Sequence, residues 1–254
     1  MAAEAAGGPE EQAGTIELLW ALRQPPTRGP KPTLTIEGIA RAAVAIADAD
    51  GLGAVSMQRV ARQLGVTKMA LYRYVAGKGE LLAVMIEQAV GDPPDLDRLR
   101  GGWRGKLRAW ARAMWATWDR HPWLPGATTG DRVLGPRELG WTECAVAALA
   151  GSGLTGREQL DAVLVLSGHL RNTRSMATAG TQPWTTGRQV ALLRQHGGRF
   201  PALAAAVPAA GDPSDRGRDH AREFGLARIL DGLEVLIAER TTTPGRPAPA
   251  PAAT

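Results

Sequence analysis

Apolar residues recur every three or four positions along most of this chain, which is the spacing of one face of an α-helix. The clearest segment runs from about 35 to 49, where Thr35 can cap the first turn. Ser56 and Thr67 can cap two shorter helices, and a fourth helix is expected at 80–90. No segment shows the strict alternation of a strand, so the pattern predicts an all-α fold. The stripe of the first segment contains Ile36, Ile39, Ala40, Ala43, Ile46 and Ala47.

The same spacing predicts further helices in the rest of the chain, at 98–119, 136–150, 157–179, 199–207 and 220–239. Pro136 suits the first position of its helix, and Thr155 with Glu158 forms a capping box. Two of these helices, 157–179 and 220–239, are apolar on more than one face, which indicates burial on two sides. In the last helix one face holds Leu226, Leu230, Leu233 and Ile237, and the other holds Phe224 and Val235.

Proline and glycine divide the chain into parts. We expect a disordered tail, a short helix at 15–22 and an extended basic arm, "RQPPTRGPKPT", within residues 1–33. The remaining parts are a helix-turn-helix head at 34–92, a helical body at 96–240 and a second disordered tail at 241–254.

The positions of the charged residues are more informative than the net charge. The net charge is only +5, but no carboxylate lies between Asp50 and Glu80 or between Glu17 and Glu37. These acid-free segments predict a surface that faces phosphate groups. Their cations are Arg59, Arg62, Lys68, Arg73 and Lys78, preceded by Arg23, Arg28 and Lys31.

Composition indicates the compartment in which the protein works. Cys144 is the single cysteine, so no internal disulfide can form, and a reducing compartment fits best. The chain has no apolar run long enough to span a membrane, and its start lacks the basic region of a secretory signal. We therefore expect a cytoplasmic protein that has no membrane partner.

The two short helices joined at Gly65 have the arrangement of a helix-turn-helix. Leu71 and Val75 would pack against the first helix, leaving the outer surface of the second for a DNA groove. A solvated hairpin in another kind of helical bundle is the alternative. The outer surface is expected to consist of Thr67, Lys68, Met69, Ala70 and Arg73, with Tyr72, Tyr74 and Lys78 positioned for phosphate contacts.

The stretch "SMQRVARQLGVTKMALYRYVAGKGELL" resembles the DNA-binding signature of the tetracycline-repressor (TetR) family, and the match covers residues 36–90. "SGHLRNT" and "EFGLARILDGLEVLI" resemble two ligand-domain helices of the branch nearest the tetracycline repressors. The resemblance implies a homodimer through 157–179 and 220–239. It also implies a small-molecule pocket in each body, and a ligand that releases a palindromic operator by changing the spacing of the two heads.

The resemblance also assigns roles to single residues of the head. Met69 and Ala70 depart from the polar residues often seen at these positions. They either touch thymine methyl groups or leave much of the specificity to the polar residues around them. The implied base or groove contacts are Gln58, Lys68, Met69, Ala70 and Arg73, and the implied phosphate contacts are Thr67, Tyr72, Tyr74 and Lys78.

A ligand pocket, if aromatic, could use the tryptophans of the body, although a purely structural core is the alternative. No magnesium site, metal spacing or cofactor motif can be assembled from the sequence. "GSGLTG" at 151–156 follows a predicted helix instead of a strand, so a dinucleotide site is not expected there. The candidate ligand contacts are Trp103, Trp110, Met114, Trp118, His121, Trp141 and His169, and Trp123 and Trp184 are further candidates for the pocket wall.

Two functional classes remain from the sequence. The first is a ligand-responsive DNA-binding regulator, most simply a repressor, which is not an enzyme and needs no cofactor. The second is a helical small-molecule-binding protein or enzyme with a vestigial helix-turn-helix. In the first class, a C2 dimer would space its two recognition helices about one DNA turn apart, ~34–36 Å.

The basic arm generates a first prediction. Deleting residues 1–32 should weaken operator binding and flatten its dependence on salt, because the arm would contribute phosphate contacts. Binding titrations at several salt concentrations measure both effects. An unchanged affinity across the titration would show that the arm is only a linker.

Overall fold

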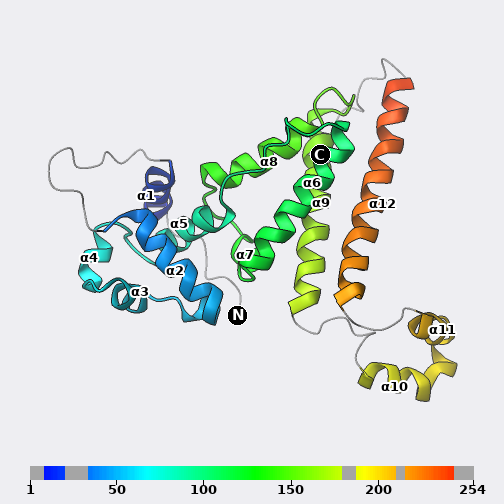
Figure 1. Ribbon diagram of the computed structural model, residues 1–254, viewed down its shortest axis with the longest axis horizontal. Coiled ribbons are helices and arrows are strands. Elements are labelled where there is room, and N and C mark those ends of the chain that lie inside the picture. The colour runs from blue at the N-terminus through cyan, green and yellow to red at the C-terminus, as the bar shows by residue number, and fades with distance from the viewer. Residues whose placement is uncertain (1–8, 21–33, 179–186, 210–214, 243–254) are drawn as a thin grey trace. The chain divides into compact units, whose positions relative to one another are not determined.

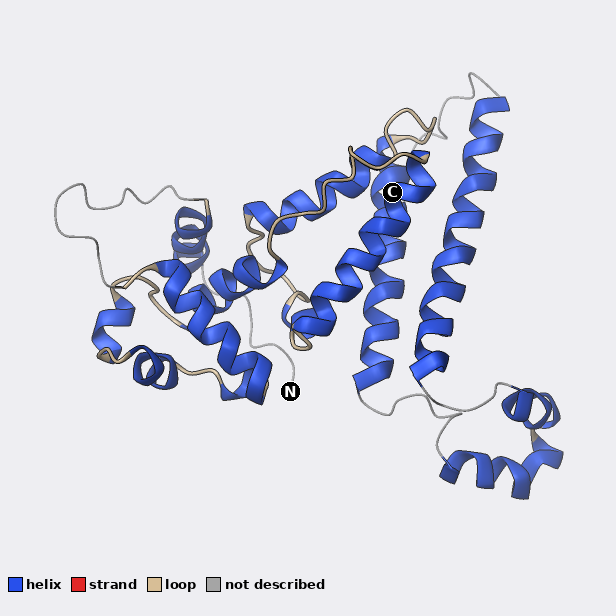
Figure 2. Ribbon diagram, in the orientation of Figure 1, coloured by secondary structure: helices blue, strands red, loops and turns tan. Residues whose placement is uncertain are grey.

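The computed structural model describes residues 9–20, 34–178, 187–209 and 215–242. Within these ranges every regular element is a helix, which confirms the predicted all-α fold (Figures 1 and 2). The predicted arm at 23–33 and Trp184 lie outside the described residues. The elements are α1 (Pro9–Leu19), α2 (Ile36–Asp50), η1 (Leu52–Ala54), α3 (Met57–Leu64), α4 (Lys68–Tyr72), α5 (Lys78–Val90), α6 (Gly102–Arg120), α7 (Leu124–Ala127), α8 (Pro136–Ala148), α9 (Gly156–Thr178), α10 (Gly187–His196), η2 (Gly197–Arg199), α11 (Pro201–Ala209) and α12 (Asp215–Thr242).

The predicted pattern of helices was wrong in three places. Helix α1 begins at Pro9, within the predicted disordered tail, and a proline is well suited to a first helical position. The stretch between the predicted helices at 98–119 and 136–150 contains the single turn of α7, whose Leu124 is buried. Helix α10 was not predicted, because this helix has only ten residues and follows a polar, glycine-containing stretch.

The chain forms two compact units, each of which is described by itself. The first unit comprises residues 1–95 and 112–144, and the second comprises residues 96–111 and 145–254. In the first unit α2 packs against α5, and Ile39, Ala43 and Ile46 of α2 are buried. Helix α1 also packs against α5, with Leu18 buried.

Asp48 of α2 joins the helix-turn-helix region to the turn between α6 and α7. Its carboxylate accepts a hydrogen bond from the indole Nε1 of Trp123 at 2.8 Å. The same carboxylate lies 2.9 Å from Nδ1 of His121. Two predicted pocket candidates, His121 and Trp123, therefore have a protein partner within this unit.

Glu87 of α5 caps the start of α8. Its carboxylate accepts hydrogen bonds from the backbone N–H groups of Arg137 at 2.9 Å and Glu138 at 3.1 Å. Burial raises the pKa of Glu87, and the two backbone hydrogen bonds oppose this rise without cancelling it. Gly135 is required beside this carboxylate, because a Cβ atom there would overlap the Glu87 side chain.

In the second unit α9 and α12 pack against each other in antiparallel order. At one end, the predicted capping box forms: the Thr155 N–H donates to the Glu158 carboxylate at 2.8 Å, and the Glu158 N–H donates to the Thr155 hydroxyl. Arg240, near the C-terminal end of α12, also bonds to Glu158. The backbone N–H of Thr155 and the Arg240 guanidinium hold the pKa of Glu158 below its usual value.

Near the middle of α9, His169 lies between the two helices. Its Nε2 donates to the backbone carbonyl of Arg222 at 3.0 Å, which fixes the position of the ring. Gly225 makes room for the ring, since a Cβ atom on this residue would overlap the imidazole. His169, another predicted ligand contact, therefore takes part in helix packing.

The start of α6 is tied to α12 by charge. The Arg104 guanidinium bonds to Asp231 and, at 3.0 Å, to Glu234. The hydrogen bond from Arg104, followed by the charge of Arg228, holds the pKa of Asp231 below its usual value. None of the helices in the described ranges is both long and apolar enough to cross a membrane. The described residues also contain no cluster of acids, histidines or cysteine that could hold a metal ion.

The contact between Gly225 and His169 predicts a stability effect. Gly225→Ala should lower the free energy of unfolding by about 1–3 kcal/mol, because the added methyl group overpacks the helix pair. Chemical denaturation at one fixed protein concentration measures the change. Gly105→Ala is the control: this glycine is exposed in α6 with open space around it, and the change should not destabilise. If His169→Ala fails to relieve the cost of Gly225→Ala in the double variant, the overlap is not its cause.

The raised pKa of Glu87 predicts a dependence on pH. In the folded protein this carboxyl group holds its proton to a higher pH than in the unfolded chain, where the pKa is near 4.5. Its contribution to stability is therefore fully present at low pH and falls as the pH rises above 4.5. The unfolding free energy of wild type minus that of Glu87→Gln should therefore fall over that range. Glu143→Gln, on the exposed face of α8, controls for the loss of a carboxylate. A difference that grows with pH would contradict the assignment.

Candidate nucleic-acid interface

Helix α3 is the supporting helix of the motif. The Ser56 hydroxyl accepts a hydrogen bond from the backbone N–H of Arg59 at 3.2 Å, as the sequence predicted. Met57, Val60 and Ala61 are buried. The helix ends at Gly65, whose φ of 67° lies in the left-handed region that favours glycine. This glycine turns the chain sharply from α3 towards α4.

Helix α4 is held from one side only. The Thr67 hydroxyl accepts from the backbone N–H of Ala70 at 3.2 Å, which confirms the predicted cap. Leu71 and Val75 are fully buried, and α4 packs against α3. The two inward positions predicted for this helix are therefore correct, and its opposite side faces solvent.

The first acid after the basic stretch points inward. Glu80 in the first turn of α5 is 2% exposed, and its carboxylate accepts from the backbone N–H of Ala76 at 2.6 Å. The carboxylate fixes the turn that leads from α4 into α5. Because it is buried, it adds no accessible negative group to the outer surface of the motif.

Cations without carboxylate partners lie on that outer surface. In the part of the chain that the structure describes, neither Arg73 nor Lys78 forms an ion pair. Lys68 forms none either, and its ammonium group lies 5.6 Å from the ring centroid of Tyr72. Arg59 differs from them, because it bonds to Asp50 at the end of α2. The basic surface is therefore narrower than the sequence suggested.

The structure brings the nine predicted DNA contacts together along α3, α4 and the start of α5. Seven are exposed, while Ala70 and Tyr74 are half-buried. Their positions suit a surface that follows a groove and its flanking phosphates. Contact of each residue with DNA stays a prediction. The exposed seven are Gln58, Thr67, Lys68, Met69, Tyr72, Arg73 and Lys78.

The predicted ligand contacts are divided between the two units. Met114, Trp118, His121 and Trp141 belong to the first unit, and Trp103, Trp110 and His169 belong to the second. Trp110, Trp118 and Trp141 are buried, and the Trp141 indole donates to the Gly91 carbonyl at 3.2 Å. Their part in ligand binding also stays a prediction.

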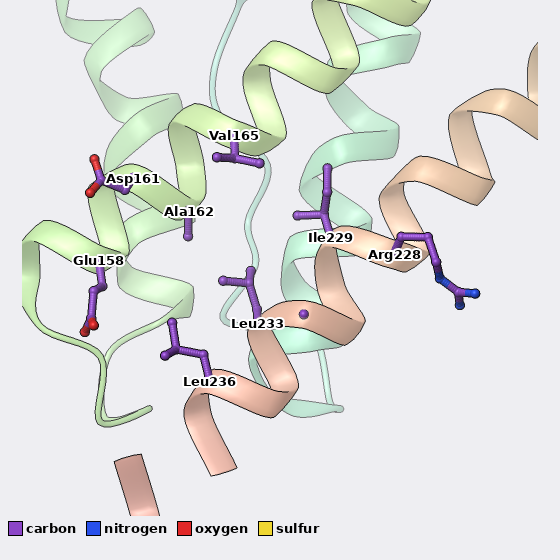
Figure 3. Close-up of a pocket in the computed structure, with 9 residues that line it drawn as sticks. Glu158, Asp161, Ala162, Val165, Arg228, Ile229, Leu233 and Leu236 are labelled. Carbon is purple, nitrogen blue, oxygen red and sulfur yellow. The ribbon is translucent and has the colours of Figure 1, made fainter. Parts of the chain in front are cut away.

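A groove of about 310 Å³ lies along α9 and α12 and contains none of the predicted ligand contacts. Figure 3 shows apolar side chains from both helices lining it, with Arg228 directed away. One feature of the sequence indicates this groove: both helices are apolar on more than one face. Its lining residues are Glu158, Asp161, Ala162, Val165, Arg228, Ile229, Gly232, Leu233 and Leu236.

Known proteins match both parts of the chain. Residues 39–85 match the bacterial regulatory proteins of the tetR family, and residues 94–237 match the tetracyclin repressor-like C-terminal domain. The chain is 40% identical to the HTH-type transcriptional repressor DrrR1 of Streptomyces coeruleorubidus over 249 residues. That alignment covers 92% of this chain and 89% of the relative.

Two solved structures from Streptomyces coelicolor are also similar. One is a possible TetR family transcriptional regulator, 27% identical with a TM-score of 0.64 over 80% of this chain and 100% of the other. The second is the TetR family protein ActR in complex with actinorhodin, 25% identical with a TM-score of 0.67 over 81% and 97% of the two chains. The matches and the helix-turn-helix geometry agree, and the chain belongs to the TetR family of DNA-binding transcriptional regulators.

Proposed function

We propose that this protein is a homodimeric repressor that binds a palindromic operator and is released by a small molecule. The observation that carries the proposal is the outer surface of α4. There, and at Lys78 in the first turn of α5, no cation pairs with a carboxylate of the described residues, while Leu71 and Val75 fix the helix from behind. DrrR1, 40% identical, is named a transcriptional repressor, which supports repression as the mode of regulation.

In the proposed complex the side chains divide into two groups. Tyr72, Tyr74 and Lys78 contact phosphates and set the position of the head on the duplex. Lys68 and Arg73 reach base edges in the major groove, where a guanidinium can bind guanine through two hydrogen bonds. Gln58, Thr67, Met69 and Ala70 complete the interface. This activity places the protein in the cytoplasm and requires no enzymatic step.

A second copy of the chain is the proposed occupant of the α9 and α12 surface. In a single chain these helices expose large apolar side chains, which soluble proteins rarely leave together in water. Pairing 157–179 and 220–239 with the same helices of a second copy would form a four-helix bundle over the groove. The exposed apolar residues are Leu160, Leu164, Val165, Phe224 and Val235.

The proposed effector is an aromatic small molecule that binds in the body. ActR, 25% identical, was solved with actinorhodin. The candidate contacts predicted from the sequence are kept for each unit by itself: Met114, Trp118, His121 and Trp141 in the first, and Trp103, Trp110 and His169 in the second. The effector weakens operator binding only by the ratio of its affinities for the DNA-bound and released conformations.

Single substitutions at the phosphate contacts test the proposed function. Duplexes selected by the wild type from a random pool should share a palindrome, and Lys78→Ala should bind the selected duplex on the order of tenfold more weakly, with a salt slope reduced by about one. Tyr72→Ala should weaken binding to all sequences alike. Gel-shift and anisotropy titrations measure both changes.

Matched variants separate these effects from general damage. Lys78→Arg keeps the charge and should retain most of the affinity. Lys106→Ala removes a cation in the body that is paired with Asp97, and it should leave binding unchanged. A wild type that selects no common sequence from the pool would overturn the proposal and favour a vestigial motif.

A further inference from the structure

Met69 is an unexpected residue at the tip of the recognition helix. Its side chain is 72% exposed, the largest exposure among the large apolar residues of the described chain. A thioether gains nothing from water, and the core of the motif does not need it. Because Met69 lies among the candidate DNA contacts of the recognition helix, its apolar side chain would face a base pair in the proposed complex.

The geometry of α4 directs Met69 outward. Met69 precedes the fully buried Leu71 by two residues, which places the two side chains about 200° apart around the helix axis. Arg73 lies one turn further along the same outer side. The outward-facing side chain here is therefore the apolar Met69, and the cation Arg73 follows it one turn later.

The neighbouring groups do not supply a polar alternative at this position. The Ala70 backbone N–H already bonds to the Thr67 hydroxyl, and the Ala70 side chain has no polar atom. The Lys68 ammonium group lies over the ring of the exposed Tyr72, 5.6 Å from its centroid. A base pair that faces Met69 and Ala70 would therefore meet carbon and sulfur instead of a hydrogen-bonding group.

Only one apolar group projects into the major groove from the bases, and it is the 5-methyl group of thymine. We propose that Met69 is a specificity-determining residue that packs on the 5-methyl group of one pyrimidine in each operator half-site. This inference rests on the proposed operator binding. It resolves the two alternatives left by the sequence in favour of direct methyl contact.

The same chemistry extends to a modified base. The 5-methyl group of 5-methylcytosine occupies the same place in the major groove as that of thymine. Met69 would therefore also favour 5-methylcytosine over cytosine at this position, whereas unmethylated cytosine and uracil would leave the thioether against water. The favoured ligand class is a base pair that carries a 5-methyl group.

Deoxyuridine removes this methyl group and changes nothing else in the base pair. In the experiment, each thymine of the selected operator is replaced in turn by deoxyuridine, symmetrically in both half-sites. At one position the wild type should lose about fourfold in affinity for each methyl group, the factor expected from burying one such group. Placing 5-methylcytosine instead of cytosine at that position should strengthen binding by a similar factor.

Variants at position 69 assign the effect to this side chain. In Met69→Ala the thymine and deoxyuridine operators should bind equally, because the methyl group has lost its partner. Met69→Gln keeps the length of the side chain but is polar, and it should lose the preference as well. Tyr72→Phe, which changes a neighbour, should keep it. Because Met69 is exposed, thermal unfolding of these variants should match wild type.

The results of this experiment separate a failure of the methyl contact from a failure of the proposed function. A wild type that binds its operator but shows no response to any thymine methyl group overturns this inference and leaves the proposed function intact. A response that persists unchanged in Met69→Ala overturns it as well, since another group must then contact the methyl. A wild type that selects no operator overturns the proposed function and this inference together.

Discussion

The burial of Leu71 and Val75 determines where the candidate DNA contacts of α4 lie. Helix α4 has only five residues, and an isolated helix of that length is not stable in water. Its position therefore depends on two fully buried side chains, on the Thr67 cap and on the turn at Gly65. Without this anchoring, the exposed side chains of α4 would have no fixed spacing, and a groove could not be read.

Several carboxylates of the first unit affect the charge of the same surface, because they bond to groups within the unit. Glu80 is buried against the Ala76 backbone, Asp50 bonds to Arg59, and Asp48 bonds to Trp123. Glu87 caps the start of α8, and its burial there disfavours the charged carboxylate and raises the pKa. Each acid stabilises a turn or a helix start within the unit. Among the described residues, no acid therefore forms an ion pair with Lys68 or Arg73 on the outer side of α4.

The sequence predicted those parts of the structure that depend on local chemistry. The caps at Thr35, Ser56 and Thr67 form, because a hydroxyl and an N–H three residues away are sufficient for a cap. The partners of His121 and His169 could not be predicted, since Asp48 and Arg222 are distant in sequence and meet them only after folding. The extent of α1 was missed for the related reason that this helix packs against α5, which is distant in sequence. The candidate DNA surface was predictable because it consists of one short continuous segment.

Few side chains are available to read bases once the phosphate contacts are assigned, and this limits what a single head can achieve. A methyl contact changes affinity by a small factor, whereas a bidentate pair to a base contributes about 1–3 kcal/mol. Two heads held in one dimer multiply these factors, because each half-site contributes separately to the same binding free energy. In the proposed dimer, the apolar surface of α9 and α12 would supply the second head that a motif this small requires. A monomer with the same α4 would hold DNA through its phosphates but would distinguish sequences poorly.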